Sequence, residues 1–422
     1  MKFAREAKIV FVNRYFYPDL SATSQLLTDL AAALAASGFP VHIICSRQRY
    51  DDPSARLARL EWIGRVCVHR VRTTRFGRDR LLGRALDYAT FYLSSTIAML
   101  RLLARDDTVI AKTDPPLLSI AAMLAARLKG AQQINWLQDI FPEVATRLGA
   151  NPLPGPLDKL LRHCRDGSLR FARVNVVLGE RMREQLQLKG IPPGTIRVIE
   201  NWAELAPDKP KPAGHSRLRS QLGLSDQFVV GYSGNLGRAH EFQTMLSAAT
   251  LLRADPGIVF LMIGGGTGMG RLAQAVAELG LTNFRFLPYQ PREAVADALA
   301  AADAHWVSLL PDLEGFIVPS KFYGILAAAR PVLFIGDPDG ELAREIGKCH
   351  CGAAVPVGDA QGAVRHLAAW RADVGLREQI GRNGEEAYHR RFCAERAFAQ
   401  WNAVLTQPGR AVDAGVQSPS GR

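Results

Sequence analysis

Apolar runs alternate with amphipathic segments along most of the chain. KIVFVN (8–13) reads as a buried strand, and it is followed by an apolar-periodic segment (24–38) and a second apolar run, VHIICS (41–46). This order predicts a strand–helix–strand unit. The same order recurs in 108–139 and in 174–201. Such alternation predicts a parallel sheet that is covered by helices on both faces.

A proline-rich stretch without periodicity, at about 200–215, interrupts this pattern. It is typical of a linker. A second series of apolar runs and periodic segments follows it. We therefore predict two doubly wound, Rossmann-like α/β domains, at 1–202 and 216–383. A helix at about 384–405 is expected to pack back on the first domain, and residues 406–422 have the composition of a disordered tail.

The length of 422 residues is sufficient for two domains with sizeable cores. No run reaches the ~20 apolar residues that a transmembrane helix requires. The N-terminus carries charges where a signal peptide has its apolar core. The six cysteines form no C-x-x-C pair, which is typical of free thiols in a reducing compartment. These features together predict a cytoplasmic protein.

The positive charge is concentrated in the first half of the chain. Residues 1–200 carry 30 Lys and Arg against 18 Asp and Glu, whereas the remainder has 22 of each. Seven arginines lie between Arg65 and Arg84, with Asp79 as the one acidic residue among them. This distribution indicates an anionic partner such as a membrane, a nucleic acid or a phosphorylated ligand. An ordinary solvated surface is the alternative interpretation.

Open parallel sheets bind ligands beyond the carboxyl ends of their strands. Two facing sheets therefore predict an active site in a cleft between the domains. GYSGNLGRAHE follows the first strand of the second domain. Gly234, Asn235 and Gly237 there would let backbone N–H groups approach a ligand, and Arg238 would bind a diphosphate. A tight turn with a solvent-facing arginine is the alternative.

IGGGTGMGR follows the next strand and contains Gly264, Gly265 and Gly266. It does not complete a G-x-G-x-x-G pattern, because Met269 occupies the last glycine position. This loop allows a ligand to come close to the backbone, but the loop alone does not identify the ligand.

The segment EGFIVPSK follows a third strand. Pro319, Ser320 and Lys321 fit the first turn of a helix, where backbone donors, a hydroxyl and an ammonium would face an anion. Glu314 precedes them and could reach the sugar end of a nucleotide sugar. Helix capping and salt bridging are the alternative roles for these side chains.

Two short patterns could in principle bind a metal. Asp337-Pro338-Asp339 is a D-x-D pattern, and Cys349-His350-Cys351 brings two thiols close together. The first is also a plain turn sequence, and the second has no further ligand pair nearby. We therefore predict no metal site.

The three loops together carry a resemblance. The ordered motifs SGNLGR, IGGG and EGFIVPSK…RPV resemble the donor half of retaining GT-B glycosyltransferases of family 4. YFYPDLSAT, WLQDIFPE and VIENWAE resemble the acceptor half and the crossover between the domains. The likeness covers roughly residues 8–405 and is strongest for the branch that builds bacterial surface polysaccharide, such as FucNAc and colanic-acid transferases.

The resemblance implies transfer of a sugar, with retention, from a nucleotide-diphosphate sugar to a lipid-linked or saccharide acceptor, without a metal or cofactor. Glu314 and Asp139 are the implied catalytic residues. Asp19, Ser21 and Thr23 are the implied acceptor contacts. The implied donor-binding residues are Gly234, Asn235, Gly237, Arg238, Gly264, Gly265, Gly266, Gly315, Phe316, Pro319, Ser320 and Lys321.

The sequence departs from the family at two positions that matter for donor binding. Glu241 stands where the family often has a lysine after the first glycine-rich loop, which leaves Arg238 and Lys321 as the expected diphosphate cations. A second glutamate normally follows the first by eight positions and holds the ribose, but Phe322 or Gly324 stands there, depending on the alignment. Glu341, which opens the next predicted helix, is a possible replacement.

The sequence also suggests a membrane partner and leaves two alternative functions open. The arginines at 65–84, with the apolar segment after them, suit peripheral contact with an anionic membrane and a polyprenyl diphosphate acceptor. A sugar-nucleotide epimerase of the same architecture remains a possible alternative. A basic nucleic-acid-binding protein is a second alternative, although few aromatic residues in the arginine-rich stretch could stack on bases.

Overall fold

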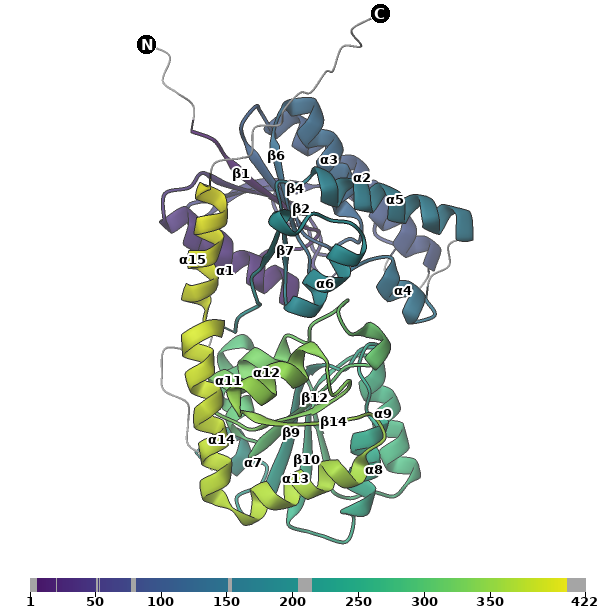
Figure 1. The fold of residues 1–422 in the computed structure, drawn as a ribbon, viewed down its shortest axis with the longest axis vertical. Helices are drawn as coiled ribbons and strands as arrows, with labels where there is room; N and C mark the ends of the chain where they lie inside the picture. Colours follow the sequence, from purple (N-terminus) through teal and green to yellow (C-terminus); the bar gives the residue numbers. More distant parts are fainter. Residues whose placement is uncertain are drawn as a thin grey trace, which may run out of the picture.

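The computed structural model describes residues 6–19, 21–50, 52, 54–76, 81–150, 154–203 and 215–407. They form two α/β domains, one above the other in Figure 1. This confirms the predicted fold class. The predicted tail, apart from its first two residues, and most of the linker lie outside the described residues.

The N-terminal domain contains an eight-stranded sheet with the order β3-β4-β2-β1-β5-β6-β7-β8. Its strands are β1 (Ile9–Val12), β2 (Val41–Ser46), β3 (Leu60–Ile63), β4 (Val66–Val71), β5 (Thr108–Ala111), β6 (Gln132–Trp136), β7 (Val174–Val177) and β8 (Ile196–Val198). Its helices are α1 (Ala22–Ala36), α2 (Leu81–Leu102), α3 (Leu118–Lys129), α4 (Glu143–Arg147), α5 (Gly155–Phe171) and α6 (Glu180–Leu188).

The C-terminal domain contains a six-stranded parallel sheet with the order β11-β10-β9-β12-β13-β14. Its strands are β9 (Phe228–Asn235), β10 (Ile258–Gly265), β11 (Phe284–Leu287), β12 (Ala304–Ser308), β13 (Val332–Ile335) and β14 (Gly352–Val355). Its helices are α7 (Arg217–Gln221), α8 (Gln243–Leu251), α9 (Thr267–Glu278), α10 (Val295–Ala300), α11 (Lys321–Ala327), α12 (Glu341–Cys349), α13 (Ala360–Ala372) and α14 (Val374–Ala387).

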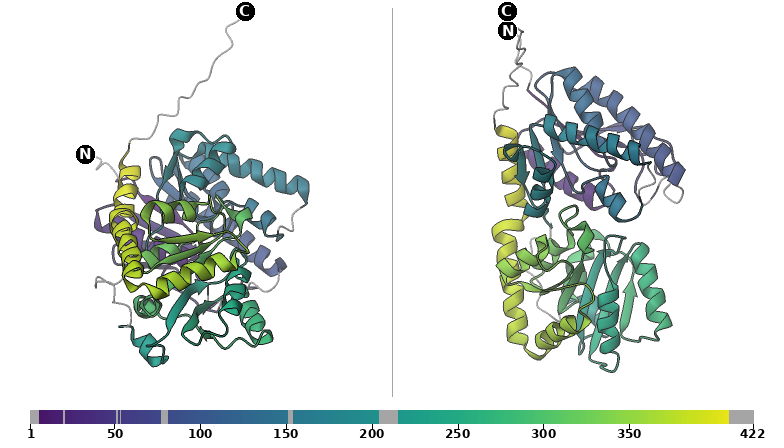
Figure 2. Two further views of the ribbon diagram at one scale, coloured as in Figure 1. Left: turned by 60° about the horizontal axis from the view of Figure 1, so that its bottom comes forward. Right: turned by 45° about the vertical axis from the view of Figure 1, so that its right-hand side comes forward.

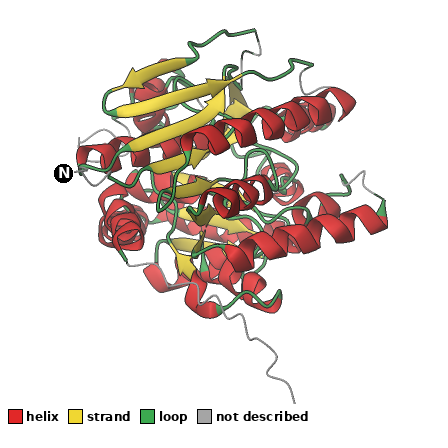
Figure 3. Cartoon of the chain, turned by 90° about the horizontal axis from the view of Figure 1, so that it is seen from above, coloured by secondary structure: helices red, strands yellow, loops and turns green. Residues whose placement is uncertain are grey.

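Helices cover both faces of the first sheet, as Figure 3 shows from above. Phe11 faces a core that includes residues of α1, whereas its neighbours Val10 and Val12 face a core with residues of α2 and α3. Successive strand residues can all be apolar because neither face meets water. None of the described helices is long and apolar enough to cross a membrane.

One expectation for the sheet was wrong at its edge. β3 pairs antiparallel with β4, and the two strands turn at Gly64, whose φ is +57°. The pairing is therefore a hairpin at the edge of an otherwise parallel sheet. The many arginines of 65–84 obscured the strand pattern in this region.

The prediction of one continuous helix at 384–405 was also incomplete, because this segment contains parts of two helices and a turn between them. α14 ends at Ala387, a π-helical turn follows at Tyr388–Phe392, and α15 runs from Ala394 to Thr406. Trp401 of α15 is fully buried in the core of the N-terminal domain, 5.0 Å from the ring of Trp136. The C-terminal helices therefore run along both domains (Figures 1 and 2).

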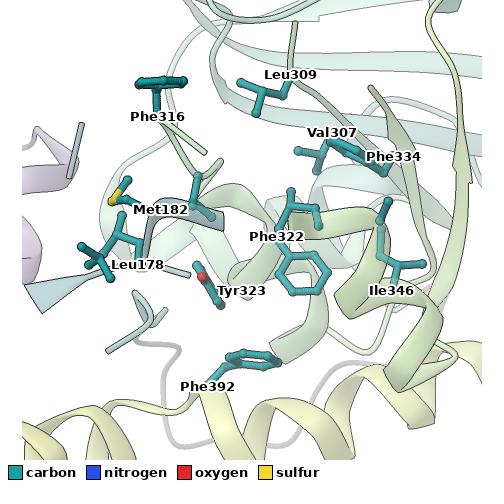
Figure 4. Close-up of a cluster of buried hydrophobic side chains, with 14 of the residues drawn as sticks. Leu178, Met182, Val307, Leu309, Phe316, Phe322, Tyr323, Phe334, Ile346 and Phe392 are labelled. Atoms are coloured by element: carbon teal, nitrogen blue, oxygen red, sulfur yellow. The ribbon is translucent and has the colours of Figure 1, made fainter. Parts of the chain in front are cut away.

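One hydrophobic cluster spans both domains. It includes Leu178 and Met182 of the N-terminal domain, and Phe316 and Phe322 of the C-terminal domain (Figure 4). A core shared in this way fixes how the loops at the facing ends of the two sheets meet.

Candidate active site

The loop between β12 and α11 is held against the N-terminal domain. The N–H of Ile140 donates to the carbonyl oxygen of Phe316 over 3.0 Å, and Asp139 forms a β-bridge with Ile317. The guanidinium of Arg147 lies 3.8 Å from the centre of the Phe316 ring. These contacts bring the predicted catalytic Asp139 into the same region as the 314–321 loop.

Lys321 is the first residue of α11, and it points toward the loop after β9. Its Nζ lies 3.1 Å from Nε2 of His240 and 5.2 Å from the centre of the Tyr232 ring. A Cβ at Gly234 would come within 2.9 Å of the Lys321 Cε, so glycine there makes room for the lysine side chain. Sequence analysis singled out Gly234 and Lys321, but not their contact with each other.

His240 was missed, although it stands in the same glycine-rich loop. Its Nδ1 lies 2.6 Å from the carbonyl oxygen of Ser308, and a carbonyl can only accept. Nδ1 therefore carries the proton, and the lone pair of Nε2 accepts a hydrogen bond from Lys321. Burial and the neighbouring Lys321 lower the pKa of His240 to about 3, so the ring stays neutral.

The Lys321 ammonium lacks a counterion. Among the described residues no carboxylate pairs with it, and His240 is a neutral partner. Burial lowers the pKa of Lys321 to about 8. A buried cation without an anion is costly to the fold, so this arrangement is typical of a site that an anionic ligand completes.

The second glycine-rich loop packs against the first. A Cβ at Gly264 would lie 2.1 Å from the carbonyl oxygen of Gly234, and one at Gly266 would lie 2.2 Å from Oδ1 of Asn235. Both glycines have positive φ, at +128° and +104°. The contact between the loops thus already requires glycine at these positions, and a donor contact there stays a prediction. Gly265 lies beside the ring of Tyr289.

Four other predicted donor residues belong to the same two loops as Gly234 and Lys321. Arg238 is exposed and, within the described part of the chain, forms no hydrogen bond or ion pair. Ser320 caps α11, but its hydroxyl makes no capping bond. Pro319 is buried, and a Cβ at Gly237 would meet only the Asn235 amide, at 3.2 Å. Arg238 and Ser320 therefore have polar groups available for a ligand.

Glu314 lies at the N-terminus of α12. One of its carboxylate oxygens accepts a hydrogen bond from the Glu341 N–H over 2.7 Å. Burial raises its pKa. The carboxylate of Glu341 in turn accepts from the N–H of Arg181, at the start of α6 in the other domain, over 2.7 Å. Glu341 thus joins the domains, which leaves it less suited to replace the missing ribose ligand.

The two possible positions of the missing second glutamate differ in burial, because Phe322 is internal and Gly324 is partly exposed. Phe322 is 1 % exposed. A Cβ at Gly324 would contact the Leu299 side chain at 3.4 Å. Gly315 and Phe316, predicted as donor contacts, lie at the domain junction, where a Cβ on Gly315 would meet Gln185 of α6 at 2.8 Å. A carboxylate at 322 would have to be buried among apolar side chains, whereas one at 324 would be partly buried beside Leu299.

Asp139 has an unusual environment for a carboxyl group. Burial, and to a smaller extent the charge of Asp114, raise its pKa to about 7. It shares the lining of a small cavity with Lys112, whose pKa burial lowers well below the usual range. The Lys112 ammonium lies 3.5 Å from the centre of the Trp136 ring and donates to the Thr23 carbonyl over 3.0 Å.

The predicted acceptor residues form a compact turn before α1. Asp19 is buried, and one of its oxygens accepts from the N–H of Ser21 at 2.9 Å and from its hydroxyl at 2.5 Å. The other oxygen accepts from the N–H of Tyr50. Asp19 is therefore committed to shaping the loop, whereas Thr23 lies in the first turn of α1 and is partly exposed.

The groups that could bind a metal already have partners within the described part of the chain. Asp339 pairs with Arg181 and Arg344, and its N–H donates to Asp337, as in a turn. A search of the described residues finds one possible metal-binding cluster, which is His42, Cys67 and His69. His42 lies near the amino-terminal end of β2, and its Nδ1 forms a hydrogen bond of 3.0 Å with Nε2 of His69. This hydrogen bond explains why the two rings lie close together without a metal ion.

Comparison with known proteins identifies both halves. Residues 22–202 match the family described as "Glycosyl transferase 4-like domain", and residues 215–387 match "Glycosyl transferases group 1". WcaI of Escherichia coli (strain K12), named as a colanic acid biosynthesis glycosyl transferase, is 26% identical over 348 residues, which are 79% of this chain and 84% of WcaI.

Solved structures share the fold at low sequence identity. Sucrose-phosphate synthase from Thermosynechococcus elongatus has a TM-score of 0.75 and 16% identity, covering 94% of this chain and 98% of its own. HepE of Anabaena in complex with UDP and glucose has a TM-score of 0.71 and 16% identity, covering 96% and 100%. The fold and the matches define a GT-B glycosyltransferase. The chain belongs to glycosyltransferase family 4, as the resemblance of its loops predicted.

Proposed function

We propose that the protein transfers a sugar, with retention, from a nucleotide-diphosphate sugar to a lipid-linked or saccharide acceptor in bacterial surface-polysaccharide biosynthesis. The observation that carries this proposal is the Lys321 ammonium, which lies between Gly234 and His240 and has no counterion among the residues that the structure describes. The name of WcaI supports the polysaccharide pathway. The leaving nucleoside diphosphate is the anion that would complete the Lys321 site.

Each residue of the site would have a separate role in the transfer. Lys321 would stabilise the negative charge that develops on the leaving diphosphate, with help from the exposed Arg238 and the backbone near Gly234. Glu314 would orient the donor sugar. Asp139 would lie on the acceptor side. No metal is needed in this scheme, because a fixed cation neutralises the diphosphate.

Nucleotides should stabilise the protein if this scheme is right. We expect a uridine diphosphate to raise the melting temperature, since UDP occupies the similarly folded HepE. A ligand at ~100 times its Kd adds ~2.7 kcal/mol to the free energy of unfolding. The measurement is a thermal-shift series with UDP, GDP, ADP and NAD, with and without Mg²⁺. Lys321→Met should lose most of the shift.

Other outcomes of this series would contradict the proposal. A shift that requires Mg²⁺ would remove metal independence. A response to NAD alone would favour the alternative of a sugar-nucleotide epimerase, which works on one substrate and needs no acceptor. Silence with every nucleotide, in a protein that still unfolds cooperatively, would remove the donor site.

We also propose that the N-terminal domain contacts an anionic membrane. Side chains on the adjacent helices α2 and α3 leave large apolar surfaces exposed, with Leu82 at 82 %, Leu93 at 66 % and Leu128 at 73 %. Arg101 and Arg127 on the same helices are exposed too. Leucines that enter the interface, together with arginines near anionic lipid, at ~1 kcal/mol each, favour peripheral binding.

One arginine of the stretch 65–84 does not belong to the proposed contact surface. Arg70 is buried, where it pairs with Glu61 and donates to the Tyr17 carbonyl, so it is not part of the surface. Arg78 and Arg80 lie outside the described residues. The exposed leucines of α2 and α3 therefore make up much of the proposed contact surface.

Vesicle co-sedimentation tests this contact. Leu93→Glu with Leu128→Glu should reduce binding to phosphatidylglycerol vesicles at least tenfold. Leu251→Glu, which alters an exposed leucine of α8 in the other domain, should have no effect. Equal binding to neutral phosphatidylcholine vesicles, or equal loss in the Leu251 control, would contradict the proposal.

A further inference from the structure

Three arginines surround a small pocket at the ends of β2 and β4. The pocket has a volume of about 130 Å³ and is lined by Arg47, Gln48, Arg72, Thr73 and Arg75. Arg47 directly follows β2, and Arg72 directly follows β4. The pocket therefore opens at the carboxyl edge of the N-terminal sheet, the edge that also carries Asp139.

Hydrogen bonds hold the pocket wall in place. The N–H of Arg47 donates to the Val71 carbonyl over 3.2 Å, which ties the two strand ends together. Nε of Arg47 donates to the Leu57 carbonyl over 2.8 Å. The Gln48 amide donates to the Thr74 carbonyl over 2.8 Å. Because only Nε of Arg47 is used, its two terminal amino groups remain available.

Within the described residues, no carboxylate balances the positive charge of this pocket. No ion pair involves Arg47, Arg72 or Arg75 in the part of the chain that the structure describes. Like charges held close together repel, so an anion would be strongly favoured between them. The planar guanidinium offers two parallel donors that match the oxygens of a phosphate.

The pocket adjoins the exposed apolar face of α2. Thr74, which lies between the pocket residues Thr73 and Arg75, donates through its hydroxyl to Asp87 of α2 over 2.7 Å. The N–H of Phe76 donates to the same carboxylate over 3.1 Å. Phe76 is exposed, and so are Leu82 and Leu86 near the start of α2. A positively charged pocket thus continues into an apolar surface.

We propose that this pocket binds the phosphate or diphosphate group of a lipid-linked acceptor, whose hydrocarbon then lies along the exposed leucines of α2. The inference rests on the proposed transfer function, and it names the class of acceptor that the second site takes. It also separates two anion sites in the protein, with Lys321 holding the donor diphosphate and the three arginines holding the acceptor phosphate.

Binding of farnesyl diphosphate to the full-length protein tests this assignment. The protein is first saturated with UDP, so that the probe cannot occupy the donor site, and binding is followed by titration calorimetry. Arg72→Gln with Arg75→Gln should weaken binding about tenfold or more, because each guanidinium provides charge-assisted hydrogen bonds. Arg65→Gln, at an exposed arginine in the β3–β4 turn, should bind as the natural protein does.

Two further probes identify the source of the phosphate. Farnesol should bind much more weakly than farnesyl diphosphate, and inorganic diphosphate should bind more weakly as well. Inorganic diphosphate that binds as tightly as the lipid would overturn the lipid-linked acceptor in favour of a free anion. Equal affinity of Arg72→Gln/Arg75→Gln and the natural protein would overturn the pocket assignment.

The test distinguishes this inference from the proposed function. Arg72→Gln with Arg75→Gln should keep the full thermal shift with UDP, because Lys321 belongs to α11 of the other domain and does not line this pocket. A loss of lipid binding with a retained UDP response supports the pocket. A protein that binds the lipid but no nucleotide would contradict the transfer function and leave the pocket as a lipid-phosphate site.

Discussion

Lys321→Met should lower kcat/KM at least about 100-fold and leave the protein as stable as before or more stable. Removal of one group that stabilises developing negative charge typically costs 10²–10³ in rate. The stability gain is expected because the ammonium lies among Gly234, Tyr232 and His240 with no counterion among the described residues. Most active-site substitutions that remove contacts have the opposite effect on stability.

The sign of the pH dependence follows from the pKa of Lys321. Burial lowers it to about 8 in the folded protein, from 10.5. Between these pH values the unfolded chain holds a proton that the folded protein has lost, so stability rises with pH. At pH 7 both states are protonated and the full penalty is present, so Lys321→Met should be more stable by up to ~3 kcal/mol. Donor affinity should instead fall as the pH rises past 8.

Urea unfolding at pH 7 and pH 10, together with initial rates of transfer, measures both effects. Lys348→Met is the matched control, because Lys348 is a surface residue that pairs with Glu345 on α12. It should change neither rate nor pH dependence. A melting temperature that falls in Lys321→Met in proportion to the activity would show that the lysine supports the fold, and the assignment would be wrong.

The contrast between Lys321 and His240 shows what the sequence could reveal. Lys321 was predictable because a lysine at the first turn of a helix, after a strand, is a recurring arrangement for anions. His240 was in the same quoted loop as Gly234, but nothing local distinguishes a histidine that accepts from a lysine 81 positions away. Its role depends on the Ser308 carbonyl, which fixes the tautomer. Such a contact arises only when β9 and β12 lie side by side.

For the glycines, the sequence predicted the position of a close contact but not the group that makes it. Gly264 and Gly266 were predictable as positions of close approach, but the sequence could not say what approaches. In the structure the backbone and side chain of the neighbouring loop, at Gly234 and Asn235, occupy that space. A glycine-rich loop at a strand end therefore identifies backbone crowding more securely than ligand contact. The fold class was easier to predict, because repeated strand–helix alternation leaves few possible topologies.

The contacts between the two domains could not be predicted from the sequence either. Glu341 was considered for ribose binding because it opens a helix in the donor domain. The structure instead joins its carboxylate to the N–H of Arg181 in the other domain. Glu314 then accepts from the N–H of Glu341. The two carboxylates link the donor loop to the domain contact, so movement of one domain would directly affect the position of Glu314.

Asp139→Asn should stabilise the protein above pH 7 while it lowers the rate of transfer about 100-fold. Burial raises the pKa of this carboxyl to about 7, from 3.8. Between these values the folded protein holds a proton that the unfolded chain has lost, so the stability of the natural protein falls as the pH rises from about 4 to 7. The neutral amide of asparagine avoids that cost at pH 8 and leaves stability almost unchanged at pH 4.

Activity should fall because a carboxyl that titrates near neutral pH is suited to proton transfer or charge stabilisation, and such groups contribute 10²–10⁴-fold. Asp312→Asn, at an exposed carboxyl just before Glu314, is the control and should change neither property. Unfolding in urea at pH 4 and pH 8, with rates measured at pH 8, separates the two effects. Equal stability of Asp139→Asn and the natural protein at pH 8 would mean that the carboxyl already meets a favourable environment. In that case a rate loss would show a need for the charge itself rather than for a perturbed pKa.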